Sequence, residues 1–558
     1  MFSNHNLLKI IFIFFIILVH SLSAKPKTPP NFIIFYVDDL GWADTSVRMD
    51  KNVEESRSYF YQTPALEKLA KQGVVFSNAY SPAPTCTPSR ISINYGMTNA
   101  RLQYTTVHDV AAKNRGRNKS IPKEHTSIPQ MLKQANLGYV TAHFGKGIAI
   151  AKPQEIGYDE HDCFDIGDNG NYHGDYVKIA PVGEREPLPA DDPKRMYSLT
   201  DTSVNFINRQ AKTKKPFFMF VSHYSAHVPH AASAHMIEKY RKLPRGKYCT
   251  DADYMNPKDM TEGFRTCSWR LQYAALVEET DMSLGRIMKA LEKHGLDKNT
   301  YVIFTSDNGG GLPPNGILNG GKSNLSEGGI RVPTVIAGPR MPAGKQCDTP
   351  IIQWDFFSTI HDLSGSTYSL PNNIDGGSLK NIFFNPENGT VKRPVPGLIF
   401  NYPYYAAAPI NAIRIGDYKL MHQLNTNEMR LYNVNTDLEE KNNLAESMPD
   451  KVKEMSTVLN TYLKKVDAIQ IDEVYTAREE ELLYYMERSK VNYDNRLKRS
   501  LQKAPKSKHS EIQQKELKRY DKRIKDLKGQ LEHLKMQMRN KKFLGGHYKE
   551  DEENYKGN

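Results

Sequence analysis

One short stretch of the chain combines a thiol, a proline and a cation. Residues 86–90 read Cys-Thr-Pro-Ser-Arg and follow a proline-rich loop. Proline at the first helical position loses no hydrogen bond, so we expect a helix here with Pro88 at its first position. Cys86 would lie where unpaired amides and the helix dipole favour an anion, and Arg90 adds a positive charge one turn on. The stretch predicts an anion site with a reactive side chain; a buried structural cysteine is the alternative.

The elements around this stretch alternate between strand-like and helix-like segments. Amphipathic helical patterns occur at 65–72 and 273–293. Short apolar runs lie at 32–37, 140–144, 217–221, 301–305 and 335–337. This alternation predicts an α/β fold with a large, mostly parallel sheet flanked by helices.

Polar side chains follow four of these predicted strands directly. They are Asp38 and Asp39, Lys146, His223 and His227, and Asp307 and Asn308. Ligands of parallel α/β sheets bind beyond the carboxyl ends of the strands. One acidic pair after a strand is usually a turn or a helix cap, but four such ends favour a common site.

The pattern changes in the C-terminal third. Segments 412–421 and 429–434 are predicted strands of a small antiparallel unit, and the chain beyond about residue 476 is charged and helical. Apolar residues at 517, 520, 524, 527, 531, 534 and 538 form a heptad seam, typical of a packed or self-associating helix. We expect a signal peptide at 1–24, a catalytic domain at 25–395, a small subdomain at 396–475 and a helical extension at 476–558.

The net charge of +12 comes from the C-terminal helical extension. Residues 488–542 contain 19 Lys and Arg against 6 Asp and Glu, a local net charge of +13, which leaves about −1 for the rest of the chain. Such a tail could lie along a polyanion. A helical brace with a solvated charged face is the alternative.

The N-terminus has the pattern of an export signal. Ile10–Val19 is almost purely apolar and is followed by small residues up to Ala24. The run is short for a membrane span, so we expect cleavage near Ala24, an exported protein and no transmembrane segment. Of the five cysteines, Cys249 and Cys267 could form a disulfide in an oxidising compartment, with free thiols equally open.

The motifs together resemble those of the type I sulfatases, in order and spacing, from about residue 30 to residue 445. The matching segments are Pro30–Trp42, Cys86–Arg90, Gly138–Ala142 with Gly145-Lys146, Thr305–Gly309, Gly320–Lys322 and Glu327–Pro333. The resemblance implies that a formylglycine-generating enzyme oxidises Cys86 to formylglycine (3-oxoalanine). The hydrated aldehyde would then attack the sulfur of a sulfate ester.

The resemblance also implies a calcium ion, Ca2+, at the strand ends. Asp38, Asp39, Asp307 and Asn308 offer only oxygen ligands, which suits a hard cation, and the side chain at Cys86 would complete the site. A zinc-dependent phosphatase of related architecture would be expected to place histidines among these ligands.

The remaining site residues also match motif positions. Arg90, Lys146 and Lys322 correspond to cations that bind the sulfate, and His227 to the histidine that protonates the leaving oxygen. Many family members continue the lysine motif as Lys-Trp-His, with that histidine as the base for sulfate release. Here Ile148 stands at its position, and we predict that His143 compensates.

A second departure follows the cysteine motif. Residues 93–96 read Ile-Asn-Tyr-Gly where the family usually has Leu-Leu-Thr-Gly, which bears on recognition by the modifying enzyme.

We therefore expect an exported sulfatase, in the periplasm or secreted, with a lysosomal location still open. Its expected substrate is a sulfated polysaccharide or its oligosaccharides, not nucleic acid, and the polar loop 168–173 could contact the sugar. Two alternatives stand beside this reading. One is a catalytically weakened relative that binds sulfated glycans, and the other is a phosphatase or phosphodiesterase on the same scaffold.

Overall fold

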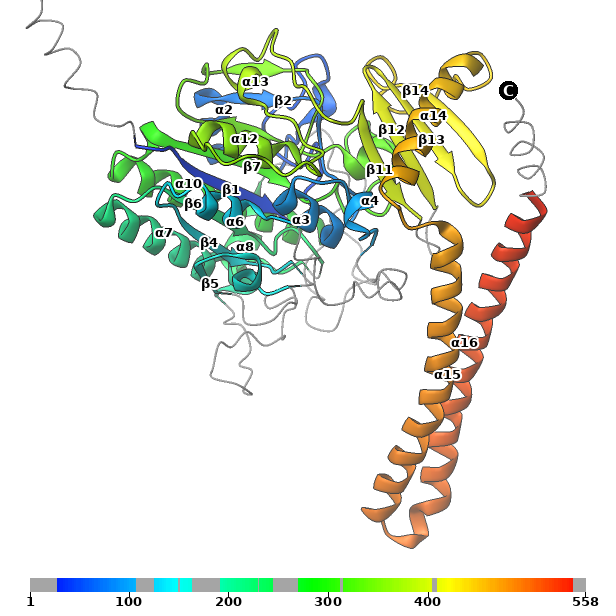
Figure 1. Ribbon diagram of the computed structural model, residues 1–558. Coiled ribbons are helices and arrows are strands. Elements are labelled where there is room, and N and C mark those ends of the chain that lie inside the picture. Colours follow the sequence, from blue (N-terminus) through cyan, green and yellow to red (C-terminus); the bar gives the residue numbers. More distant parts are fainter. Residues whose placement is uncertain are drawn as a thin grey trace, which may run out of the picture.

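A computed structural model describes residues 28–106, 125–148, 151–162, 191–228, 230–243, 269–311, 315–403 and 409–544. Figure 1 shows an α/β body, a small sheet beside it and a long pair of helices that projects away from both. Residues 1–24, the loop 168–173, Cys249 and Cys267 lie outside the described residues.

The body is built on an eight-stranded sheet in the order β5-β4-β6-β1-β7-β8-β2-β9. Its strands are β1 (Asn31–Val37), β2 (Val74–Phe76), β4 (Val140–Gly145), β5 (Glu160–His161), β6 (Phe217–Ser222), β7 (Thr300–Ser306), β8 (Val335–Ala337) and β9 (Lys345–Cys347). β4, β6, β1 and β7 are neighbours and run parallel, whereas β8 pairs antiparallel with β7. The predicted α/β fold is confirmed, and the four strand ends that carry polar residues lie side by side.

Helices cover both faces of this sheet because its strands are apolar on both sides. Phe32, Ile34 and Tyr36 of β1 pack with one set of helices, and Ile33, Phe35 and Val37 with the other. The first set contains α3 (Cys86–Tyr95), α6 (Ile128–Gln134), α12 (Asp355–Ser364) and α13 (Lys380–Phe384). The second contains α2 (Pro64–Gln72), α7 (Met196–Thr213), α8 (Ala234–Lys242) and α10 (Trp269–Lys293). Short elements β3 (Ala79–Tyr80), β10 (Ile351–Ile352), α4 (Asn99–Leu102) and α11 (Glu327–Ile330) complete the body.

The small antiparallel sheet has four strands in sequence order. They are β11 (Leu398–Tyr402), β12 (Ile410–Ile415), β13 (Tyr418–Gln423) and β14 (Glu428–Asn433), and α14 (Pro449–Lys465) packs on them. The prediction of one strand over 412–421 is wrong. Gly416 turns the chain at a φ of 57°, which glycine adopts readily, so this segment belongs to two strands of a hairpin.

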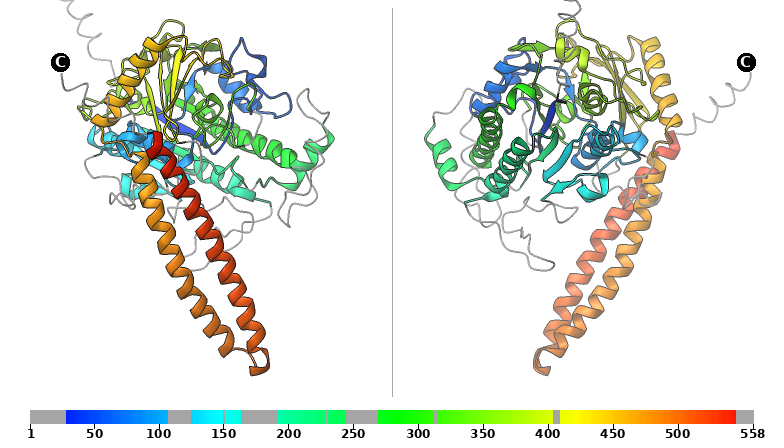
Figure 2. Two further views of the ribbon diagram at one scale, coloured as in Figure 1. Left: turned by 90° about the vertical axis from the view of Figure 1, so that its right-hand side faces the viewer. Right: turned by 60° about the vertical axis from the view of Figure 1, so that its left-hand side comes forward.

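The C-terminal helices α15 (Ile471–Gln502) and α16 (His509–Leu544) form a long hairpin, seen from two sides in Figure 2. Leu527, Leu531 and Leu534 of the predicted seam are buried against Ile471 and Leu482 of α15. This part of the seam therefore packs within the chain, and self-association stays a prediction. Within the described residues, no helix is long and apolar enough to cross a membrane.

Candidate active site

Helix α3 begins at Cys86 and brings the thiol to the edge of the sheet. Thr85 has extended backbone angles before the first turn, and Ser89 N is the first amide to donate back to it, to Thr85 O at 3.4 Å. Pro88 is thus the third residue of the helix, not the first as predicted. The position is still tolerated, because the first amides of a helix have no partner within it.

The loops after β1 and β6 are joined at the backbone. Asp38 N donates to Ser225 O at 2.6 Å, and Ala226 N donates back to Asp38 O. Asp39 has a left-handed φ of 62°, which aspartate tolerates better than most residues. This pairing brings His227 to the acidic pair.

Arg90 lies at the centre of the site, with its side chain 2% exposed. Its Nε and Nη2 both donate to Asp307 Oδ2, at 3.0 and 2.7 Å, and Nη2 lies 3.5 Å from Asp38 Oδ1. The guanidinium also donates to Ser222 Oγ and lies over the Tyr36 ring, 5.2 Å from its centroid. Arg90 therefore ties the carboxylates of two strand ends together.

The two predicted lysines approach the acidic pair from other loops. Lys146 Nζ donates to Asp38 Oδ2 at 2.6 Å, and Lys322 Nζ donates to Asp39 Oδ2 at 2.7 Å. Burial would raise the pKa of Asp38, but Lys146, His227 and Arg90 hold it well below its usual range. Burial and the charge of Asp38 raise the pKa of Asp307 to about 8. The cluster is crowded with charge and shielded from water.

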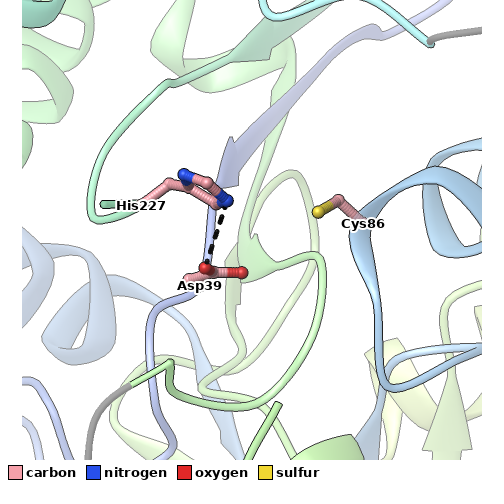
Figure 3. Close-up of side chains that lie close together, drawn as sticks. All are labelled: Asp39, Cys86 and His227. Atoms are coloured by element: carbon pink, nitrogen blue, oxygen red, sulfur yellow. Dashed lines mark ion pairs between the residues drawn. The ribbon is translucent and has the colours of Figure 1, made fainter. Parts of the chain in front are cut away.

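The Cys86 sulfur faces this cluster. It lies within 4.8 Å of ligand atoms of Asp38 and Asp307, and equally of Asp39 and His227. Figure 3 shows the thiol from the helix side pointing toward Asp39 and His227. Burial raises the pKa of the thiol to about 12. An unmodified Cys86 is therefore neutral near pH 7 and a poor nucleophile, since the thiolate is the reactive form.

His227 presents one ring nitrogen to the site. Its Nδ1 donates to the Val228 carbonyl at 2.5 Å, which leaves Nε2 as the free proton acceptor, 3.7 Å from Asp39 Oδ2 (Figure 3). Burial lowers the pKa of the imidazole, while Asp38 and Asp39 act in the opposite sense. The residue is placed to exchange a proton at Nε2.

Within the part of the chain that the structure describes, two buried oxygens in the cluster accept no hydrogen bond. They are Asp38 Oδ1 and Asn308 Oδ1; the amide nitrogen of Asn308 is used by Asp39 Oδ1 at 2.8 Å. A buried oxygen without a hydrogen bond lowers the stability of the fold, so its presence indicates that a further group, such as an ion, binds there. A hard cation fits them, because carboxylate and amide oxygens are its preferred ligands and the neighbouring carboxylates supply negative charge.

His143 does not join the cluster. Its ring is stacked on Phe220 at 5.3 Å and meets the edge of Tyr158 at 5.2 Å, and burial lowers its pKa to about 3. Such a weak base, held between two rings, does not support the predicted role in sulfate release. Ile148, at the position of the missing histidine, is buried in the apolar cluster with Phe220.

Sequence reasoning missed two residues that hold Arg90. Ser222 ends β6, accepts from Arg90 and donates to the Lys146 carbonyl at 2.6 Å. Tyr36 supplies the ring beneath the guanidinium and donates to Gln353 Oε1 at 2.7 Å. The alternation of β1 could have indicated Tyr36, because it shares a face with Phe32 and Ile34.

Comparison with known proteins gives a consistent assignment. A model of the sulfatase family matches residues 30–366. N-acetylgalactosamine-6-sulfatase of Mus musculus is 28% identical over 75% of this chain and 76% of its own length. The ulvan-active sulfatase of Formosa agariphila is 25% identical over 70% of this chain and 72% of its own.

A solved structure shares this fold. Ps i-CgsB, in complex with k-i-k-neocarrahexaose, superimposes with a TM-score of 0.64 and 25% identity, covering 79% of this chain and 94% of that one. The chain belongs to the type I sulfatases, a family of sulfuric ester hydrolases.

Proposed function

We propose that this protein removes sulfate from a sulfated polysaccharide or its oligosaccharides, outside the cytoplasm. The observation that carries the proposal is a pair of buried oxygens that accept no hydrogen bond among the described residues, Asp38 Oδ1 and Asn308 Oδ1. They lie in a cluster that also holds Cys86 and the side-chain cations of Arg90, Lys146 and Lys322. Relatives that act on sulfated sugars support the substrate class.

We propose Ca2+ as the resident cation, held by Asp38, Asp39, Asp307 and Asn308, where it would polarise a sulfate oxygen. Formylglycine at position 86 would supply a hydroxyl nucleophile in place of the neutral thiol. The other groups of the chain bind and orient the ester. Lys146 and Lys322 direct ammonium groups at the cluster and can share them with an incoming sulfate.

His227 Nε2 is the group for proton transfer. Burial lowers the pKa of this imidazole, and the carboxylates of Asp38 and Asp39 oppose that shift, so they stabilise the imidazolium once Nε2 has taken up a proton. In that form Nε2 can donate to the alcohol oxygen that leaves the sulfate. The N-terminal signal pattern supports export. The lack of histidines among the four oxygen ligands speaks against a zinc phosphatase.

The burial of Ile148 favours one second candidate, a relative that binds sulfated sugars and releases sulfate slowly. The test of both is sulfate release from a panel of singly sulfated sugars, with the matching phosphate esters as controls. We expect multiple turnovers on at least one sulfated sugar and none on the phosphates. A single burst of desulfated sugar equal to the enzyme concentration, without matching release of sulfate, would support the slow-release candidate, and preference for phosphate would overturn the proposal.

A further inference from the structure

The hairpin of α15 and α16 projects away from the body (Figures 1 and 2). Its charge is distributed unevenly along its length. Residues 471–487, next to the body, contain 6 Asp and Glu against 1 Arg. Residues 488–523, around the far end, contain 13 Lys and Arg against 4 Asp and Glu, a net charge of +9. Residues 524–542, which return toward the body, contain 6 Lys and Arg against 2 Asp and Glu. The part of the hairpin near the body therefore has a net charge of about −1, and the positive charge is concentrated at the far end.

A groove of about 510 Å³ lies between the two helices within this basic part. Its walls carry four arginines and two tyrosines, together with a serine and an asparagine. The arginines and tyrosines are Arg488, Arg496, Arg519, Arg523, Tyr485 and Tyr520. No carboxylate is among these lining residues, so the groove concentrates guanidinium groups.

The charges of the groove are only partly compensated. Arg496 and Arg519 share one carboxylate, Glu516, at 3.5 and 3.1 Å, and Glu516 is buried behind them. Within the described part of the chain, neither Arg488 nor Arg523 forms an ion pair; Arg488 donates only to Tyr484. Two guanidinium groups therefore remain available for an external anion.

We propose that this groove is a second binding site for a sulfated polysaccharide chain, separate from the site at Cys86. Guanidinium groups match the oxygens of sulfate with paired N–H donors, and tyrosine rings offer flat apolar surfaces for sugar rings. Arg488 and Arg496 are eight residues apart on α15, about 12 Å along the helix, so one chain can meet several charges.

We identify the ligand of the groove as a sulfated polysaccharide because the same polypeptide carries a sulfatase site. In this respect the inference rests on the proposed function. A polymer held on the hairpin stays near the catalytic body, which raises the effective concentration of its sulfate esters. Nucleic acid is the competing class of polyanion, and the experiment includes it.

The experiment compares pairs of substitutions in the full chain. Binding of heparin and of chemically desulfated heparin is measured by titration calorimetry at two salt concentrations. The test pair is Arg488→Ala with Arg523→Ala, and Arg488→Lys with Arg523→Lys keeps the charge. The matched control is Lys498→Ala with Lys525→Ala, two exposed lysines of the same hairpin that do not line the groove.

We expect the alanine pair in the groove to weaken heparin binding about 10-fold or more, since it removes two guanidinium groups whose N–H donors can pair with sulfate oxygens. The lysine pair should fall between this variant and the unsubstituted chain, and the control pair should change binding by less than about 2-fold. Desulfated heparin should bind weakly to every variant. Circular dichroism at 222 nm verifies that the hairpin stays helical.

Equal losses in the groove and control pairs would overturn the proposal, because binding would then follow net charge alone. Tighter binding of a 20-base-pair DNA duplex than of heparin, lost with the same arginines, would also overturn it. These readouts do not need turnover. A chain that binds heparin through the groove but releases no sulfate from any sugar would refute the proposed function and leave the groove in place.

Discussion

Two buried charge clusters of this protein use the same residue types to opposite effect. In the first, at the carboxyl ends of β1 and β7, Asp38 Oδ1 and Asn308 Oδ1 have no hydrogen-bond partner. In the second, between the body and the small sheet, Glu327 accepts from Lys419 at 2.8 Å, Arg331 at 2.7 Å and Tyr80 at 2.6 Å. Lys419 also pairs with Glu440 at 2.6 Å.

The difference separates a cluster built for stability from one built for a ligand. Lys419 is fully buried, and both of its carboxylate partners come from segments distant in sequence, so this cluster fastens the small sheet to α11. In the Cys86 cluster, oxygens without a hydrogen bond can bind a cation, and the ammonium groups of Lys146 and Lys322 can bind an anion. Removing charge should therefore affect folding in one cluster and chemistry in the other.

The largest effect is expected from Lys419→Met, which leaves two buried carboxylates without their shared cation. Breaking a buried ion pair in this way should lower the free energy of unfolding by about 3–5 kcal/mol. The remaining folded enzyme should keep its kcat. Denaturant unfolding and sulfate release measure the two quantities, and Lys419→Met with Glu440→Gln should recover part of the stability. An unchanged free energy of unfolding would contradict the stabilising role of the Lys419 cluster.

Lys322→Met should show the reverse pattern. The Lys322 side chain is 23% exposed, and its partner Asp39 also lies beside His227, so its loss should lower the free energy of unfolding less than the loss of the fully buried Lys419 does. Because it removes a preorganised cation from the developing charge, kcat/KM should fall about 100-fold or more. A fall in stability without a fall in kcat/KM would place Lys322 with the structural residues.

Cation binding should stabilise the folded protein, and it should do so through the first cluster only. Ca2+ at 100 times its Kd should raise the free energy of unfolding by about 2.7 kcal/mol, and chelation should reverse the gain. Asn308→Ala should abolish this shift. Asn401→Ala is the matched control, since Asn401 Oδ1 is also buried and unpartnered but lies in the small sheet. An equal loss in both variants would argue against a cation at the Cys86 cluster.

His143 gives the smallest expected effect, through pH. Its pKa is lowered to about 3 by burial, so the unfolded chain binds this proton first and stability falls as pH drops below about 6.5. At pH 5 this side chain should have removed roughly 2 kcal/mol relative to pH 7.5. His143→Phe should lose correspondingly less stability over this interval, as thermal unfolding at both pH values would show. A large loss of turnover in the same variant would instead favour the predicted role in sulfate release.

The sequence predicted most of the site because the relevant residues directly follow strands. The runs ending before Asp38, Lys146, His223 and Asp307 predicted four strands, and parallel pairing brings their ends together. No local pattern reveals that Arg90 is held by Ser222 and Tyr36, since these contacts join segments far apart in the chain.

Other features depend on tertiary contacts in the same way. Glu327 and Lys419 are 92 residues apart, and nothing near either one indicates the other. The heptad seam of α16 predicted a packed helix, but the spacing alone could not distinguish a partner in the same chain from a second copy. The pair Gly416-Asp417 is a turn signal that divides 412–421, and the prediction of one strand overlooked it.

The most direct test of the Cys86 site is sulfate release by the unsubstituted chain and by Cys86→Ala. Both are produced with a formylglycine-generating enzyme and assayed with Ca2+ on the best sulfated sugar of the panel. We predict release by the unsubstituted chain, together with a peptide mass that shows formylglycine at position 86, and only background release by a folded Cys86→Ala variant. Equal release by the two proteins would contradict the assignment of this site.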